Sequence, residues 1–301
     1  MKVFLNGRIV GKNDALVSVF DRGFVYGDGI YETMLAKNSN IFRLDEHLDR
    51  LKNSARLLDI KLPFSKKFFS DACYKVLRAN RLESARVRIE VTRGVSELSY
   101  NAKSAVKPTV VVIVSEFKVW PDQYYRNGVD VAISGVRRNN KYSLDPSIKS
   151  SNCLNQILAA QEAKKRGAFE AIMLNTDGFV AEGTISNVFA AKNGVLFTPN
   201  LNTGILDGVT RQCVINLAKS EKVKFREIYM RPAELFGADE CFITSSTLEV
   251  MPVATVDGKK IGCGRPGFLT VLLGEWLKNL IEAETLDRED CRKIIRRQVL
   301  I

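Results

Sequence analysis

The chain has 301 residues, of which 46% are hydrophobic and 26% are charged. These proportions are ordinary for a globular protein and exclude a disordered or collagen-like chain. The sequence contains no run of about 20 apolar residues, so we expect no membrane span and no membrane partner. The N-terminal stretch lacks the apolar core of a signal peptide, which favours a cytoplasmic location.

The formal net charge of +11 raises the question of nucleic-acid binding. The basic residues stand in short clusters such as Arg137-Arg138, without interleaved aromatic residues, which favours a solvated surface and no nucleic-acid partner. The six cysteines are scattered without a C-x-x-C pair, and His47 is the only histidine. A metal site built from Cys and His is therefore not expected, nor is a hydrolase that needs a catalytic histidine.

Residues 1–118 are predicted to form a small α+β domain. Asn6-Gly7 separates two alternating segments and predicts a hairpin. Apolar residues recur at spacings of three and four over residues 44–58, which predicts an amphipathic helix, and residues 65–79 are expected to form a second helix. Strands are expected at residues 86–92 and 109–114.

A linker at residues 119–128, which contains Pro121, is expected to lead into a larger domain at residues 129–284. Its expected elements are a strand at residues 129–135, a helix after Lys149 that stops near Gly167, and a helix at residues 210–219. Tight hairpins are expected at Asp177-Gly178, Asn193-Gly194 and Asp257-Gly258. Residues 285–301 form a charged tail with a helical pattern. Turn-rich strands with few helices indicate an α+β protein.

Four features of the larger domain could carry chemistry. Lys149 precedes a helix, and Glu182 lies among predicted strands. The segment 208–211, Gly-Val-Thr-Arg, begins a helix whose free N–H groups would suit a phosphate. The hydroxyl-rich run 244–247 follows a strand and could bind a phosphate or simply end the strand in a turn. Each feature alone is unremarkable, but a pyridoxal 5'-phosphate (PLP) enzyme needs a lysine, a carboxylate and a phosphate cup together.

Six segments, in this order, resemble the class IV aminotransferases, which are fold-type IV PLP enzymes. The segments are FDRGFVYGDGIYET (20–33), RLDEHLDRL (43–51), IKSSN (148–152), AEGTISNVF (181–189), LDGVTR (206–211) and FITSSTLEVMPV (242–253). The resemblance covers nearly the whole chain. It implies a two-domain α+β fold like that of the D-amino-acid aminotransferases, with the cofactor PLP between the domains.

The resemblance also implies roles for individual residues. Lys149 matches the catalytic lysine to which the family attaches PLP, and Arg50 matches the arginine that grips the cofactor phosphate. Arg50 would otherwise be interpreted as an exposed partner of Glu46, four residues earlier. The other matched cofactor contacts are Glu182 facing the pyridine nitrogen, Val209 and Thr210 at the phosphate, and Ser246 and Thr247 near the phosphate and the substrate.

Three activities share this pattern, and the residues leave all three open. Tyr31 resembles a substrate-site tyrosine of the D-amino-acid aminotransferases, but residues 95–100 lack the arginine and histidine that those enzymes place there. Arg88 falls where branched-chain aminotransferases place a carboxylate-binding arginine, although such a strand residue often only faces solvent. Leu154 stands where those enzymes keep a tyrosine, and the lyases often have leucine there. We rank branched-chain L-amino-acid transamination with 2-oxoglutarate first, D-amino-acid transamination second and aminodeoxychorismate lyase third.

Two further expectations concern assembly and class. The family usually forms homodimers in which a partner loop completes each active site, so the resemblance implies a homodimer. A basic binding protein that retains the scaffold is the non-enzymatic alternative. The joint presence of Lys149, Arg50 and Glu182 argues against loss of the cofactor.

Overall fold

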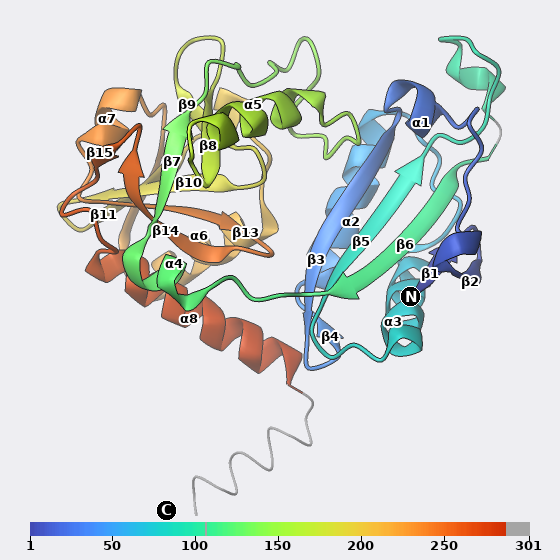
Figure 1. Cartoon of the computed structure of the whole chain (residues 1–301), viewed down its shortest axis with the longest axis horizontal. Coiled ribbons are helices and arrows are strands. Elements are labelled where there is room, and N and C mark those ends of the chain that lie inside the picture. The colour runs from blue at the N-terminus through green and yellow to red at the C-terminus, as the bar shows by residue number, and fades with distance from the viewer. Residues whose placement is uncertain (106, 287–301) are drawn as a thin grey trace, which may run out of the picture. The chain divides into compact units, whose positions relative to one another are not determined.

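The structure is a computed structural model that describes residues 1–105 and 107–286 (Figure 1). It divides into two compact units, Met1–Lys118 with the residues from Lys278 onward, and Val119–Leu277. The last turns of helix α8 (Phe268–Thr285) thus group with the first unit, whereas the sequence analysis assigned residues up to 284 to the larger domain. The reason is local: Asn40 Nδ2 donates to the Thr285 carbonyl at 2.8 Å.

The first unit is built on one antiparallel sheet in the order β2-β1-β6-β5-β3-β4 (Figure 1). The strands are β1 (Lys2–Leu5), β2 (Arg8–Gly11), β3 (Gly29–Lys37), β4 (Asn40–Ile41), β5 (Ala85–Thr92) and β6 (Thr109–Glu116). The predicted Asn6-Gly7 hairpin is confirmed, and both residues have the positive φ angles that a tight turn requires. A short helix α1 (Arg22–Tyr26) precedes β3.

Two helices, α2 (Leu44–Leu57) and α3 (Lys66–Asn80), pack on one face of this sheet and confirm the predicted amphipathic helix and the second helix expected after it. Ser65 caps α3 by accepting a hydrogen bond from the Phe68 N–H at 3.2 Å. Successive side chains of each strand point to opposite faces of the sheet. One set is buried under the helices, and the other set is partly exposed on the opposite face. The position of a residue along its strand therefore tells whether its side chain lies under the helices or on the opposite face.

The second unit is built on a sheet that closes on itself. The order is β12-β11-β10-β13-β14-β7-β8-β9, and β9 also pairs with β10, which closes the ring. The strands are β7 (Val129–Ile133), β8 (Glu170–Leu174), β9 (Val180–Gly183), β10 (Asn187–Lys192), β11 (Val195–Pro199), β12 (Lys224–Ile228), β13 (Glu240–Ser245), β14 (Glu249–Val256) and β15 (Lys259–Lys260). The three predicted Asp-Gly and Asn-Gly hairpins are confirmed as the β8–β9, β10–β11 and β14–β15 turns.

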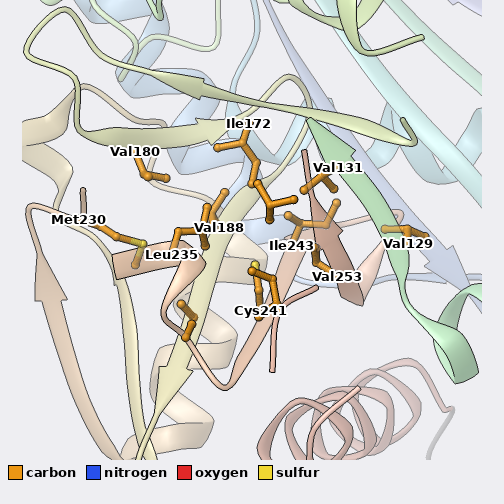
Figure 2. Packing of buried hydrophobic residues seen from close by; sticks show 14 of the residues in the cluster. Val129, Val131, Ile172, Val180, Val188, Met230, Leu235, Cys241, Ile243 and Val253 are labelled. Carbon is orange, nitrogen blue, oxygen red and sulfur yellow. The ribbon is translucent and has the colours of Figure 1, made fainter. Parts of the chain in front are cut away.

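The main core of the second unit is formed by inward-facing side chains of the closed sheet. Val131, Ile172, Val188 and Ile243 come from four different strands and meet there (Figure 2). Each is almost completely inaccessible to solvent. Residues at neighbouring positions on these strands therefore point to the outer face, because successive side chains of a strand alternate.

Helices cover the outer face of the closed sheet. Helix α5 (Leu154–Lys165) packs on β7 and β8, and α6 (Val209–Ser220) packs on β12 and β13. Both were predicted, and Gly167 follows α5 with the positive φ expected at its end. The remaining helices are α4 (Asp122–Asn127) and α7 (Pro232–Phe236). Helix α4 lies where only a linker was expected, because six residues are too few to show a helical period.

These elements confirm the α+β fold class. Within residues 1–105 and 107–286, no helix is both long and apolar enough to cross a membrane. Most of the charged tail, residues 287–301, lies outside the described residues.

Candidate active site

Glu182 reaches the outer face of the closed sheet through an irregularity in β9. Ile172 pairs with Gly183 but Leu174 pairs with Val180, so β9 contains one extra residue between the two pairs. Such a bulge interrupts the alternation of side chains, so that a residue after it points to the opposite face from the one that a regular strand would give. Val180 therefore points into the core, while Glu182, directly opposite Asn187, points away from it.

Three donors fix the buried carboxylate of Glu182. Arg138 Nε donates to Oε1 at 2.8 Å, and Oε2 accepts from Asn187 Nδ2 at 3.3 Å and from the Leu206 N–H at 2.9 Å. Every one of these partners is a donor, so both carboxylate oxygens are fixed in position. The predicted acid is thus held in one orientation on the outer face.

Arg138 is a partner of Glu182 that the sequence analysis missed. It was grouped with Arg137 as part of a solvated basic cluster, and that interpretation is wrong for Arg138, whose side chain is only 6% exposed. Its main-chain N–H donates to the Leu174 carbonyl, which extends the pairing beyond the end of β7. The position of Arg138 next to apolar strands was a clue in the sequence that it could be buried. The sequence could not name its partner, because Glu182 lies 44 residues away along the chain.

The start of α6 adjoins Asn187. A Cβ built on Gly208 would lie 2.1 Å from Asn187 Oδ1, so the main chain approaches that side chain more closely than any larger residue would allow. Val209 and Thr210 begin the helix and are both buried, and the first N–H groups of a helix have no intrahelical acceptor. The predicted phosphate contacts therefore lie next to the residue that binds Glu182.

The hydroxyl-rich segment 244–247 ends β13 beside the same residue. Thr244 pairs directly with Asn187, so its side chain lies on the outer face. Thr244 Oγ1 is buried and has no hydrogen-bond partner among the described residues. Ser246 and Thr247, the residues predicted from the sequence, follow in the half-buried turn between β13 and β14, where the Thr247 carbonyl accepts from Trp120 Nε1 at 3.1 Å.

A second buried carboxylate supports the loop after Glu182. Glu170 accepts hydrogen bonds from the Thr184 and Ile185 N–H groups and from the Thr184 and Ser186 hydroxyls, at 2.6–3.3 Å. Burial raises the pKa of Glu170, whereas these hydrogen bonds act in the opposite direction. The sequence analysis did not identify this residue, which fixes the path of the chain between Gly183 and Asn187.

Lys149 lies in the loop between β7 and α5 and is half-buried. The loop is shaped by a turn in which Asp145 accepts from the Ser147 N–H through its side chain and from the Ile148 N–H through its carbonyl. After Lys149, the Ser150 hydroxyl accepts from the Asn152 N–H at 3.1 Å. Lys149 thus stands between two local turns directly before a helix.

In the first unit, Arg50 is held by a carboxylate rather than by its neighbour on the helix. Arg50 Nε and Nη2 donate to the two oxygens of Glu32, each at 2.7 Å, and His47 Nδ1 lies 2.8 Å from Glu32 Oε2. Glu46, the alternative partner suggested by the sequence, binds Arg43 instead. Arg50 binds Glu32 because the Glu32 side chain points from β3 toward the helices, where it meets the buried side of α2.

The charge of this network stabilises the first unit at neutral pH. Burial alone would raise the pKa of Glu32, but Arg50 and His47 outweigh it and hold the pKa far below the ordinary value of 4.5. A depressed carboxylate pKa contributes stability above the ordinary value, and that contribution is lost as the pH falls through the folded-state pKa. Arg50 is therefore oriented by an anion throughout the neutral range.

Tyr31 and Arg88 lie on the other, partly exposed face of the same sheet. The Arg88 guanidinium carbon is 3.9 Å from the centroid of the Tyr31 ring, and Arg88 Nε donates to Glu90 at 2.6 Å. Arg88 is 36% exposed, so it is neither a plain solvent-facing side chain nor a buried one. The structure brings together two of the three residues predicted to bind substrate, and the third, Thr247, lies in the second unit.

The donors of the second unit fit a phosphorylated pyridine. An oriented carboxylate, a glycine-preceded helix start and an unpaired buried hydroxyl surround Asn187 on one face. A carboxylate suits a protonated ring nitrogen, and helix N–H groups suit a phosphate. Among residues 1–105 and 107–286 no group of three or more His, Cys, Asp or Glu side chains could hold a metal ion.

Known proteins resemble this chain over almost its whole length. A family described as amino-transferase class IV matches residues 29–256. A Methanocaldococcus jannaschii protein, provisionally named a branched-chain-amino-acid aminotransferase, is 41% identical over 93% of this chain and 96% of its own. The D-alanine aminotransferase of Bacillus licheniformis is 36% identical, covering 95% and 99%.

A solved structure agrees with these relatives. The T.th. branched-chain amino acid aminotransferase, complexed with N-(5'-phosphopyridoxyl)-L-glutamate, superposes with a TM-score of 0.89 at 30% identity. The match covers 94% of each chain. The fold described above is therefore the fold of that enzyme.

Proposed function

The chain belongs to the class IV aminotransferases, which are PLP enzymes, and on that premise we propose that it moves amino groups between branched-chain L-amino acids and 2-oxoglutarate. The observation that carries the proposal is the Glu182 carboxylate, fixed by Arg138, Asn187 and the Leu206 N–H beside the start of α6. We further propose ping-pong kinetics and retain the cytoplasmic location expected from the sequence.

PLP, when bound, would hold the substrate amino group and accept the electron pair left on the substrate Cα. Glu182 would face the protonated ring nitrogen, because its three donors hold the carboxylate in one orientation. The helix-start N–H groups of Val209 and Thr210, the hydroxyls of Ser246 and Thr247, and the Arg50 guanidinium would bind the phosphate.

Lys149 would supply the proton transfer. Its Nζ would remove the proton from the substrate Cα in one half-reaction and return a proton in the other. Arg88 would attract a substrate carboxylate to the face that it shares with Tyr31. Hydrolysis by water would then release the amino acid's carbon skeleton as a 2-oxo acid, with the amino group retained by the cofactor. A second oxo acid would take up that amino group and give back the water by the reverse sequence.

D-amino-acid transamination is the second candidate function. It is favoured by Tyr31 and by the 36% identity to a D-alanine aminotransferase. Residues 95–100 nevertheless offer no arginine or histidine, and the loop is tied down by Arg22, which donates to the Ser99 carbonyl at 2.6 Å. Arg88 is the side chain on the Tyr31 face that favours the branched-chain activity.

The test of the function is the visible absorbance of the PLP-loaded protein after addition of separate amino donors. If L-leucine converts the bound cofactor to its amino form and 2-oxoglutarate restores it, the proposal stands. Conversion by D-alanine alone would replace it with the second candidate. Consumption of aminodeoxychorismate alone, with release of pyruvate, would identify a lyase, and failure to bind PLP would favour the binding-protein alternative.

We also propose a homodimer, as the family resemblance implies. Exposed apolar side chains of the first unit lie on two adjoining segments, because the Ser96 N–H donates to the Phe20 carbonyl and Asp21 bridges Val95. The exposed residues there are Val19, Phe20, Phe24, Val95, Leu98 and Tyr100. Apolar side chains gathered in this way are typical of a surface that a partner covers. A solution mass from light scattering equal to one chain would contradict the dimer.

Arg50→Gln is expected to weaken PLP binding by roughly 10- to 100-fold, because a charged hydrogen-bond donor to phosphate contributes about 1.5–3 kcal/mol. The measurement is the dissociation constant of PLP from fluorescence titration of the cofactor-free protein. Arg56→Gln is the matched control, since Arg56 lies on the same helix but is exposed. Equal dissociation constants for Arg50→Gln and the unaltered protein would remove Arg50 from the phosphate site.

A further inference from the structure

Arg88 is already bound to a carboxylate of its own chain. Its Nε donates to Glu90 Oε1 at 2.6 Å, and its Nη1 donates to Thr33 Oγ1 at 3.3 Å. The guanidinium also stacks over the Tyr31 ring, 3.9 Å from the ring centroid. A cation is thus held between an anion, a hydroxyl and an aromatic face.

Strand register explains why these four side chains meet. In the β3–β5 pair, Thr33 lies directly opposite Arg88, and Tyr31 lies directly opposite Glu90. Residues two apart on a strand share a face, and directly opposite residues are in contact, so the four side chains form one cross-strand cluster. The cluster occupies the face of the sheet that α2 and α3 leave uncovered.

The positive charge of Arg88 is partly offset by the negative charge of Glu90. Glu90 is 23% exposed and Arg88 is 36% exposed, so solvent screens the ion pair only in part. A carboxylate that approaches Arg88 must compete with Glu90 for the same guanidinium and is repelled by it. A monocarboxylate with an apolar chain brings one negative charge toward Glu90, whereas a dicarboxylate brings two and is repelled more strongly.

We propose that Glu90 is a specificity-determining residue that weakens binding of dicarboxylate substrates at Arg88 relative to monocarboxylates with apolar side chains. The inference rests on the proposed function, in which Arg88 attracts substrate carboxylates. The chemical class favoured by the cluster is an aliphatic monocarboxylate, with a dicarboxylate accepted at reduced affinity.

The test compares binding of glutarate and 4-methylpentanoate to the PLP-loaded protein by titration calorimetry. Glu90→Gln keeps a hydrogen-bond acceptor beside Arg88 but removes the charge. We expect it to tighten glutarate binding roughly fivefold, the effect of a partly screened pair, and to change 4-methylpentanoate binding less than about twofold. Glu116→Gln, an exposed carboxylate on the neighbouring strand β6, is the matched control and is expected to change neither.

A double-mutant cycle separates charge competition from support of the fold. In an Arg88→Leu background, Glu90→Gln is expected to lose its effect on glutarate. An unchanged ratio of the two dissociation constants, or weaker binding of both acids by Glu90→Gln, would overturn the inference. Glutarate binding requires no turnover, so a protein that fails to transaminate L-leucine would contradict the proposed function without deciding this measurement.

Discussion

Lys149→Ala is expected to lower kcat for transamination by about 10⁴-fold or more, because one side chain would serve as both the attachment point of PLP and the base. Lys149 lies in the loop between two local turns and is half-buried, so its loss should leave the closed sheet intact. The measurements are steady-state rates with L-leucine, together with the mass of the protein after borohydride treatment. The mass should rise by one cofactor in the unaltered protein and stay unchanged in Lys149→Ala.

Lys141→Ala is the matched control for this experiment. Lys141 is exposed in the same loop and contacts the Tyr142 ring. Its removal should change neither the rate nor the mass increase by a measurable amount. Normal transamination by Lys149→Ala would exclude Lys149 as the catalytic lysine, and loss of activity in both variants would instead point to damage to the loop.

Glu182→Gln is expected to lower kcat by about 100- to 1000-fold, comparable to the loss of one oriented charge-stabilising group in other active sites. A neutral amide cannot keep the ring nitrogen protonated, and its single oxygen can accept from Arg138 or from the Leu206 N–H but not from both. The variant also leaves the buried Arg138 cation without its carboxylate, so some loss of stability is expected. The rate is therefore measured at saturating PLP and alongside thermal unfolding.

Glu227→Gln provides the control for that loss of stability. Glu227 is, with Asp207, one of two carboxylate partners of Arg211, which is completely buried, and it lies on β12 away from the bulge of β9. Its substitution should lower the melting temperature by a similar amount while changing kcat less than about threefold. A small effect of Glu182→Gln on kcat, no larger than that of Glu227→Gln, would reject Glu182 as the acid at the ring nitrogen.

The sequence by itself determined the local elements and the family. Apolar spacing located α2, because a helix must bury one stripe of its surface. Asn-Gly and Asp-Gly pairs located the hairpins, because those residues adopt positive φ at low cost. The order of the motifs identified the family and named Lys149, Glu182 and the helix start at Val209. All of these are properties of residues that lie close together in the chain.

Only the tertiary structure decided which charges meet. Arg138 was grouped with a surface cluster but binds Glu182, and Arg50 binds Glu32 rather than its helix neighbour Glu46. The physical reason is that such pairs depend on strand register and on a bulge, since one extra residue in β9 reverses which side chains face outward. Neither strand register nor a bulge produces a periodic pattern in a single sequence. The partners of a buried charge can therefore be identified only when strands that are distant in the chain are placed side by side.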